Sequence, residues 1–136
     1  MRRAHLHAAV ALLLCAVAAP AFAATVSFGC ITNSSASDCA IGSAQLKLDI
    51  TSEGPGQVRF KFSNPGTQQS VISEVYFDDG SLLGIASIVN GSGVVFQQDA
   101  NPPDLPGGNN AVPPFQVTAG FLAEAVPSPA MNGVGP

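Results

Sequence analysis

Two neighbouring runs of alternating apolar and polar residues constrain the fold of this chain more than any other feature. Over residues 44–50, Ala, Leu, Leu and Ile alternate with Gln, Lys and Asp, and over residues 58–62, Val, Phe and Phe alternate with Arg and Lys. A period of two is typical of a strand with one buried face. Gly54-Pro55-Gly56 separates the runs and is typical of a turn. The pattern predicts an antiparallel hairpin with one apolar face and one face of mixed charge.

Further short strands are expected along the chain, and turn signals separate them. The expected strands cover residues 25–28, 71–77, 82–89, 94–97 and 115–124, and the turns cover residues 64–66, 78–80 and 90–93. Residues 98–114 are rich in proline and glycine and are expected to form an irregular surface loop. Helical periodicity is found nowhere, so six or seven strands with no helix between them are predicted. This favours an all-β fold, an antiparallel β-sandwich that is jelly-roll-like or immunoglobulin-like.

The first 23 residues have the pattern of a secretory signal peptide. Arg2 and Arg3 form a basic start, residues 8–19 are an unbroken apolar run, and Ala21-Phe22-Ala23 offers the small-x-small sequence that signal peptidase recognises. We predict cleavage between Ala23 and Ala24. The apolar run is shorter than the roughly 20 residues of a spanning helix, and no second run of that length follows, so no membrane span is expected in the mature chain.

Removal of the leader would change the chemistry that the chain can perform. Both histidines, His5 and His7, lie in the leader, and so does Cys15. Serine and cysteine hydrolases of the usual kind need an imidazole or an equivalent base beside the nucleophile, and none would remain. No catalytic residue is therefore predicted and a non-enzymatic protein is expected.

Charge excludes two classes of partner. The mature part keeps three basic residues, Lys47, Arg59 and Lys61, against nine acidic ones, a net charge of −6. Binding to nucleic acid or to an anionic membrane depends on clustered lysine and arginine, so neither partner is expected. Few charges together with a good supply of Val, Ile and Phe fit a folded, exported β domain over residues 24–125. Residues 126–136 have the composition of a linker, or of a loop cut short.

Cys30 and Cys39 would be the two cysteines of the mature chain. In an oxidising compartment such a pair is expected to form a disulfide. A zinc site needs four suitable ligands, which two cysteines and no histidine cannot supply. A redox site would need a tighter C-x-x-C spacing.

Acidic residues of the loops supply the candidate ligand sites. Carboxylate and amide oxygens are the ligands that calcium prefers, and they could converge if two turns meet. The candidates are Asp78, Asp79, Asp99, Asn101 and Asp104. Solvated turn residues are the simpler interpretation, and the spacing from Asp99 does not match an EF-hand. Asp78 with Asp79 could also act as a glycosidase pair, but Tyr76 is the only tyrosine and tryptophan is absent, whereas a glycosidase cleft is normally lined with such rings.

Several ordered phrases resemble a known group of exported proteins. They are ITNSSASDCAIGSAQLKLDI at residues 31–50, EVYFDDGSLLGIASIVNGSGVVF at residues 74–96, LPGGNN at residues 105–110 and TAGFLAEA at residues 118–125. Together they resemble bacterial proteins that carry a PEP-CTERM sorting signal. The resemblance implies an envelope or extracellular-matrix protein of a bacterium that makes exopolysaccharide, with a domain of unknown molecular activity.

The chain departs from this family at its end, where the Pro-Glu-Pro motif, the spanning helix and the basic tail are not found. We therefore expect either a fragment or a relative that is simply released, with a sandwich left incomplete and an unpaired edge at Ala125. The expected location is the periplasm, the cell surface or the medium, and the expected partners are polysaccharide or other envelope components. The alternative function is a carbohydrate-binding or calcium-dependent adhesion module that uses Tyr76 and the acidic turns.

Overall fold

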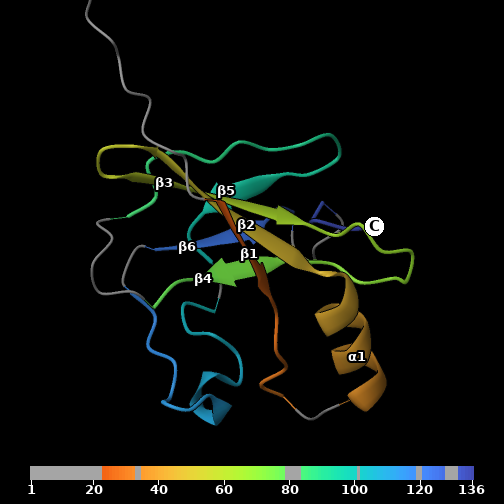
Figure 1. Cartoon of the computed structure of the whole chain (residues 1–136). Coiled ribbons are helices and arrows are strands. Elements are labelled where there is room, and N and C mark those ends of the chain that lie inside the picture. Colours follow the sequence, from red (N-terminus) through yellow and green to blue (C-terminus); the bar gives the residue numbers. More distant parts are fainter. Residues whose placement is uncertain (1–22, 33–34, 79–83, 101, 119–120, 128–131) are drawn as a thin grey trace, which may run out of the picture.

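The chain folds mainly into β-strands, which form two small antiparallel sheets accompanied by one α-helix (Figure 1). The computed structural model describes residues 23–32, 35–78, 84–100, 102–118, 121–127 and 132–136. The elements are β1 (Ala23–Ser27), α1 (Ala36–Gln45), β2 (Lys47–Gly54), β3 (Gln57–Ser63), β4 (Glu74–Tyr76), β5 (Phe96–Gln98), the 3₁₀ turn η1 (Gly108–Asn110) and β6 (Leu122–Ala125). The prediction of a mainly β fold is therefore confirmed. The two sheets do not close on each other. Residues 1–22, all but the last residue of the predicted signal peptide, lie outside the described residues.

The predicted hairpin is the centre of the N-terminal sheet, whose strand order is β1-β2-β3. Leu48 pairs with Phe62 and Ile50 with Phe60, which places the apolar residues of both strands on one face. Asp49 pairs with Lys61 on the opposite face, as the alternation predicts. The turn needs glycine, because Gly54 and Gly56 have φ of 119° and 73°, a region in which other residues are strained.

Helix α1 contradicts the prediction that no helix separates the strands. Residues 44 and 45 end this helix, so β2 begins at Lys47 and not at Ala44. The Ser35 hydroxyl accepts a hydrogen bond from the Asp38 backbone N–H at 3.3 Å and caps the helix. Asp38 also lies in the first turn, where its charge is favourable to the helix dipole. The spacing Ser35-x-x-Asp38 is the sequence signal that reasoning from periodicity missed.

The C-terminal sheet has the order β4-β6-β5, so β6 is its central strand. Glu74 pairs with Glu124 on one side of β6, and Phe96 pairs with Ala125 on the other. The expectation of an unpaired edge at Ala125 was therefore wrong. The prediction of a strand over residues 82–89 was also wrong for residues 84–89, which the structure describes and which are not in a strand. The last strand is shorter than expected and begins at Leu122.

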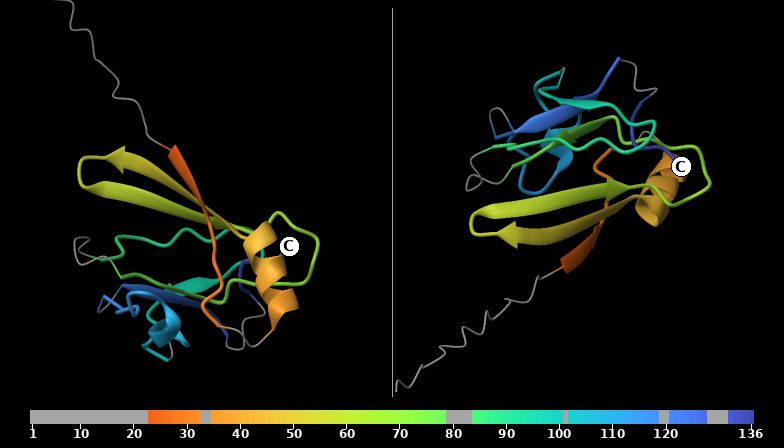
Figure 2. Two further views of the ribbon diagram at one scale, coloured as in Figure 1. Left: turned by 60° about the horizontal axis from the view of Figure 1, so that its bottom comes forward. Right: turned by 90° about the horizontal axis from the view of Figure 1, so that it is seen from above.

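Aromatic rings join the two sheets, which Figure 2 shows as two layers. The ring of Phe77 lies 5.0 Å from that of Phe60 in β3, with the planes at 61°, and 4.1 Å from that of Phe121, where the rings stack. Such pairs contribute about 0.5–1.5 kcal/mol each beyond the area that they bury. The buried apolar side chains among the described residues gather around β6 and are Ile72, Phe121, Leu122, Ala123 and Ala125.

The described part of residues 126–136 packs against the rest of the chain, although its composition is that of a linker. Val134 and Ile72 exchange two backbone hydrogen bonds of 3.0 Å. The Asn132 carbonyl accepts from Val95 N at 2.9 Å, and its amide donates to the Val126 carbonyl at 2.8 Å. Gly133 is buried, and a Cβ there would collide with Ile72. This segment is therefore bonded to Ile72 just before β4 and to Val95 just before β5.

Candidate functional site

The predicted disulfide is present and links the segment after β1 to helix α1. Cys30 and Cys39 are bonded, and their Cα atoms are 5.5 Å apart. Cys39 lies in the first turn of α1, one residue after Asp38. The bond therefore fixes the start of the helix relative to the first sheet.

The structure places the candidate calcium ligands in different surroundings. Asp78 accepts a hydrogen bond from the Gln116 backbone N–H at 3.0 Å. Asp99 follows β5 with φ of 77°, and its N–H donates to the Leu122 carbonyl at 3.0 Å. Asp104 lines a surface pocket. Asp79 and Asn101 lie outside the described residues, and within the described ranges no group of three or more His, Cys, Asp or Glu side chains is placed to hold a metal ion.

The pocket beside Asp104 is the candidate functional site. It is a half-open surface pocket with a volume of 380 Å³. Sequence reasoning singled out Asp104 but none of the other residues that line it. The lining residues are Asp104, Leu105, Gly107, Gly108, Asn109, Phe115, Gln116 and Val117.

The pocket is built by the proline-rich loop folding back on itself around η1. Gly108 N–H donates to the Leu105 carbonyl at 2.9 Å, and Phe115 N–H donates to the Gly108 carbonyl at 3.0 Å. Gly107 has φ of 77°, and a Cβ there would lie 2.6 Å from the Thr32 methyl group. Glycine is thus required where this loop approaches the disulfide segment.

Tyr76 of β4 and Asp78, two residues further on, hold the loop near its two ends, at Pro102 and at Gln116. The Tyr76 hydroxyl lies 2.8 Å from the Pro102 carbonyl and 3.2 Å from Glu74 Oε2. Asp78 holds Gln116 as described above. Burial and the neighbouring charge of Glu74 raise the pKa of Tyr76 to about 12, so the phenol stays protonated and keeps donating. Tyr76, which the sequence suggests as part of a binding surface, therefore anchors the loop through its hydroxyl.

The lining of the pocket combines three kinds of group. The lining residues include Asp104, which carries a carboxylate, Asn109 and Gln116, which carry amides, and Phe115, which carries an aromatic ring. Amides and carboxylates can bind hydroxyl groups, and a ring can cover the apolar face of a sugar or another small molecule. Among the described residues that line the pocket, Asp104 is the one that carries a carboxylate.

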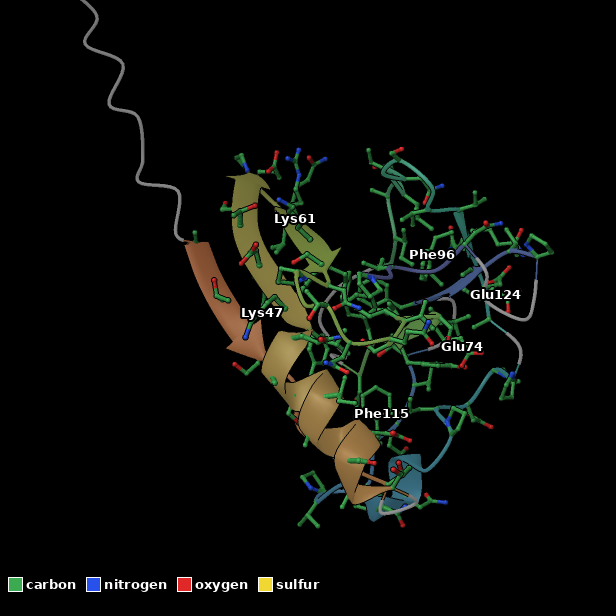
Figure 3. The ribbon with its side chains drawn as sticks, turned by 90° about the vertical axis from the view of Figure 1, so that its right-hand side faces the viewer. Lys47, Lys61, Glu74, Phe96, Phe115 and Glu124 are labelled. Carbon is green, nitrogen blue, oxygen red and sulfur yellow. A yellow bond between two sulfur atoms is a disulfide. The ribbon has the colours of Figure 1, made fainter. Side chains whose placement is uncertain are left out.

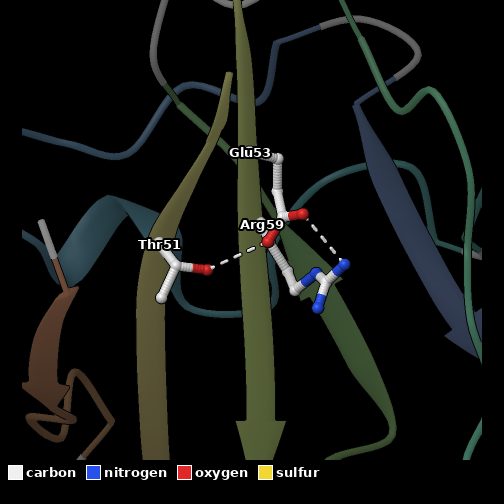
Figure 4. A network of polar contacts seen from close by, with 3 residues as sticks. All are labelled: Thr51, Glu53 and Arg59. Atoms are coloured by element: carbon white, nitrogen blue, oxygen red, sulfur yellow. Dashed lines mark hydrogen bonds and ion pairs between the residues drawn. The ribbon is translucent and has the colours of Figure 1, made fainter. Parts of the chain in front are cut away.

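The N-terminal sheet carries charges of both signs, and a pair of acidic residues lies on the C-terminal sheet (Figure 3). Lys47 and Lys61 lie on the N-terminal sheet, and Glu74 and Glu124 face each other across β4 and β6. Arg59 forms a 3.0 Å ion pair with Glu53, which also lies near Thr51 (Figure 4). The Arg59 side chain is 65% exposed, so this pair contributes at most about 1 kcal/mol to stability.

Comparisons of the chain with family models, with curated proteins and with solved structures find no match. Among the described residues, no helix is long and apolar enough to cross a membrane.

Proposed function

We propose that this chain is a non-enzymatic protein exported to the bacterial envelope or extracellular matrix. The observation that carries the proposal is the disulfide between Cys30 and Cys39, because such bonds form and persist mainly in oxidising compartments. The basic and apolar pattern of residues 1–23 supports export independently. The resemblance to PEP-CTERM proteins supports the envelope or matrix as the destination. In such a protein the two sheets would form the halves of a β-sandwich.

Fractionation of a bacterium that expresses the full reading frame tests this proposal. The protein is expected in the periplasm, at the cell surface or in the medium. Replacing Leu12 and Leu13 by Arg should retain it in the cytoplasm, because charge in the apolar region blocks recognition of the leader. Recovery of the unchanged protein from the cytoplasm alone would refute export.

The pocket favours a second function, the binding of a glycan or a similar polyhydroxylated ligand. This candidate depends on Asp104, Asn109, Gln116 and Phe115, which together line one surface pocket. Amide and carboxylate groups beside an aromatic ring are suited to hydroxyl-rich ligands. An exopolysaccharide of the producing bacterium would then be the partner.

A glycan array followed by calorimetry tests binding at the pocket. Gln116→Ala should weaken any binding at least tenfold, since it removes an amide from the lining while leaving the backbone N–H that Asp78 binds. Gln57→Ala on β3 is the matched control, since Gln57 is exposed and does not line the pocket. A flat array, or equal loss in both variants, would contradict glycan binding at this site.

Calcium is tested separately through thermal stability. If Asp104 and the other loop acids bind calcium, adding the ion should raise Tm, and Asp104→Asn should reduce the rise. An unchanged Tm would exclude a calcium-dependent adhesion module.

A further inference from the structure

The outer edge of β1 is the most exposed strand edge of the N-terminal sheet. All five residues of β1 are exposed, and Val26 keeps 41% of its surface accessible. β1 pairs with β2 on one side only, and no described residue forms a backbone hydrogen bond with its other side. Figure 3 shows β1 at the margin of the molecule, beyond the hairpin. A free edge of this kind is a template for another strand.

Other edges of the two sheets carry features that oppose such pairing. The amide of Asn90 binds both the N–H and the carbonyl of Phe96 and so caps β5. Val134 pairs with Ile72 just before β4. β3 carries Arg59 and Lys61, and charged side chains disfavour edge association. β1 contains no charged residue and no proline.

We propose that β1 pairs with β1 of a second copy of this chain, antiparallel and centred on Thr25. A two-fold axis perpendicular to the sheet and midway between the two Thr25 residues would set Thr25 opposite Thr25, and Ala24 opposite Val26. Ala24 and Val26 pair with Ile50 and Leu48 of β2, so the apolar face continues across the junction. Shifting the register by one residue would set apolar residues opposite polar ones. Threonine pairs across antiparallel strands are also favourable.

The charges of two acidic copies permit this arrangement. The nearest acidic residue on the sheet is Asp49, which pairs with Thr25 and accepts its hydroxyl at 2.8 Å. The two Asp49 residues would lie three strand spacings apart, about 14 Å. That is beyond the screening length of about 8 Å at physiological salt. The six-stranded sheet would then end in β3 on both sides, which favours a closed dimer over a fibre.

Disulfide trapping tests the pairing and its register, independently of the proposed function. Opposed residues of an antiparallel pair have Cα atoms about 4.5–5.5 Å apart, which a disulfide can span. Thr25→Cys in the exported full-length product should therefore give a covalent dimer on a non-reducing gel. Ser27→Cys is the matched control, since two Ser27 residues would be about 13 Å apart along the strands. Peptide mapping should find Cys30 still bonded to Cys39.

Sedimentation of the protein without added cysteines gives the second measurement. At increasing concentration the mass should approach twice that of one chain. Thr25→Lys should hold it at the mass of one chain, whereas Gln57→Lys on β3 should not. The proposal is overturned if Thr25→Cys stays monomeric, if Ser27→Cys crosslinks as efficiently, or if both lysine variants associate alike.

Discussion

Tyr76 is the only tyrosine of the chain, and its hydroxyl holds the proline-rich loop through the Pro102 carbonyl. Its pKa is raised to about 12 by burial and by the charge of Glu74. The folded chain thus keeps a proton that the unfolded chain releases near pH 10. The contribution of Tyr76 to the free energy of unfolding is therefore fully present below pH 10. It should be lost as the pH rises toward 12.

Ultraviolet absorbance of the tyrosinate measures this pKa without interference from a second tyrosine or from tryptophan. We expect ionisation near pH 12 in the folded protein and near pH 10 in denaturant. Tyr76→Phe should remove the absorbance change and flatten the loss of stability between these values. Ionisation of the folded protein near pH 10 would show that the contact with the loop is not made.

Gly66 lies directly against the side chain of Gln45, a contact that no sequence pattern indicates. Gln45 is buried, and its amide binds the Gln68 backbone and the Ser70 hydroxyl. A Cβ at Gly66 would collide with this side chain. Gly66→Ala should therefore lower the free energy of unfolding by about 1–3 kcal/mol in urea denaturation. Gly29→Ala, where a Cβ meets nothing within 4 Å, should have little effect.

The Cys30–Cys39 bond ties helix α1 to the segment that follows β1. The chain-entropy model gives about 2.7 kcal/mol for a loop of about ten residues. Replacing both cysteines by Ala should lower the free energy of unfolding by about this amount and reduce the helical circular dichroism. The reduced wild-type protein is the control, and it should match the double variant. Equal stability with and without the bond would show that the helix does not depend on it.

Local patterns predicted some elements and missed others for physical reasons. The hairpin of β2 and β3 was predictable because its two strands are adjacent in sequence and alternate strictly. Helix α1 was missed because Ala44 and Leu46 continue the strand-like alternation, while the tertiary bonds of Gln45 favour the helix end there. The order β4-β6-β5 depends on strands far apart in sequence, which alternation cannot pair. The pocket was missed because only the fold of the loop brings Asn109, Phe115 and Gln116 together, and no local sequence pattern shows this.

Phe77 joins the two sheets through its ring contacts with Phe60 and Phe121. Phe77→Ala should lower the free energy of unfolding by about 2–3 kcal/mol, somewhat less than for a fully buried ring. Phe28→Ala is the matched control. The ring centroid of Phe28 lies 6.5 Å from that of Phe62 in β3, so this ring pair lies within the N-terminal sheet and does not reach the other sheet. If Phe28→Ala lowers the free energy of unfolding as much as Phe77→Ala does, the ring of Phe77 does not join the two sheets.

The intact mass of the protein recovered outside the cytoplasm tests export, processing and the disulfide in one measurement. Cleavage after Ala23 would leave β1 to begin at Ala24, the residue that pairs with Ile50. We predict a chain that starts at Ala24, with Cys30 bonded to Cys39 and a mass two hydrogens below that of the reduced form. A chain that keeps residues 1–23, with both thiols free and found only in the cytoplasm, would contradict this account.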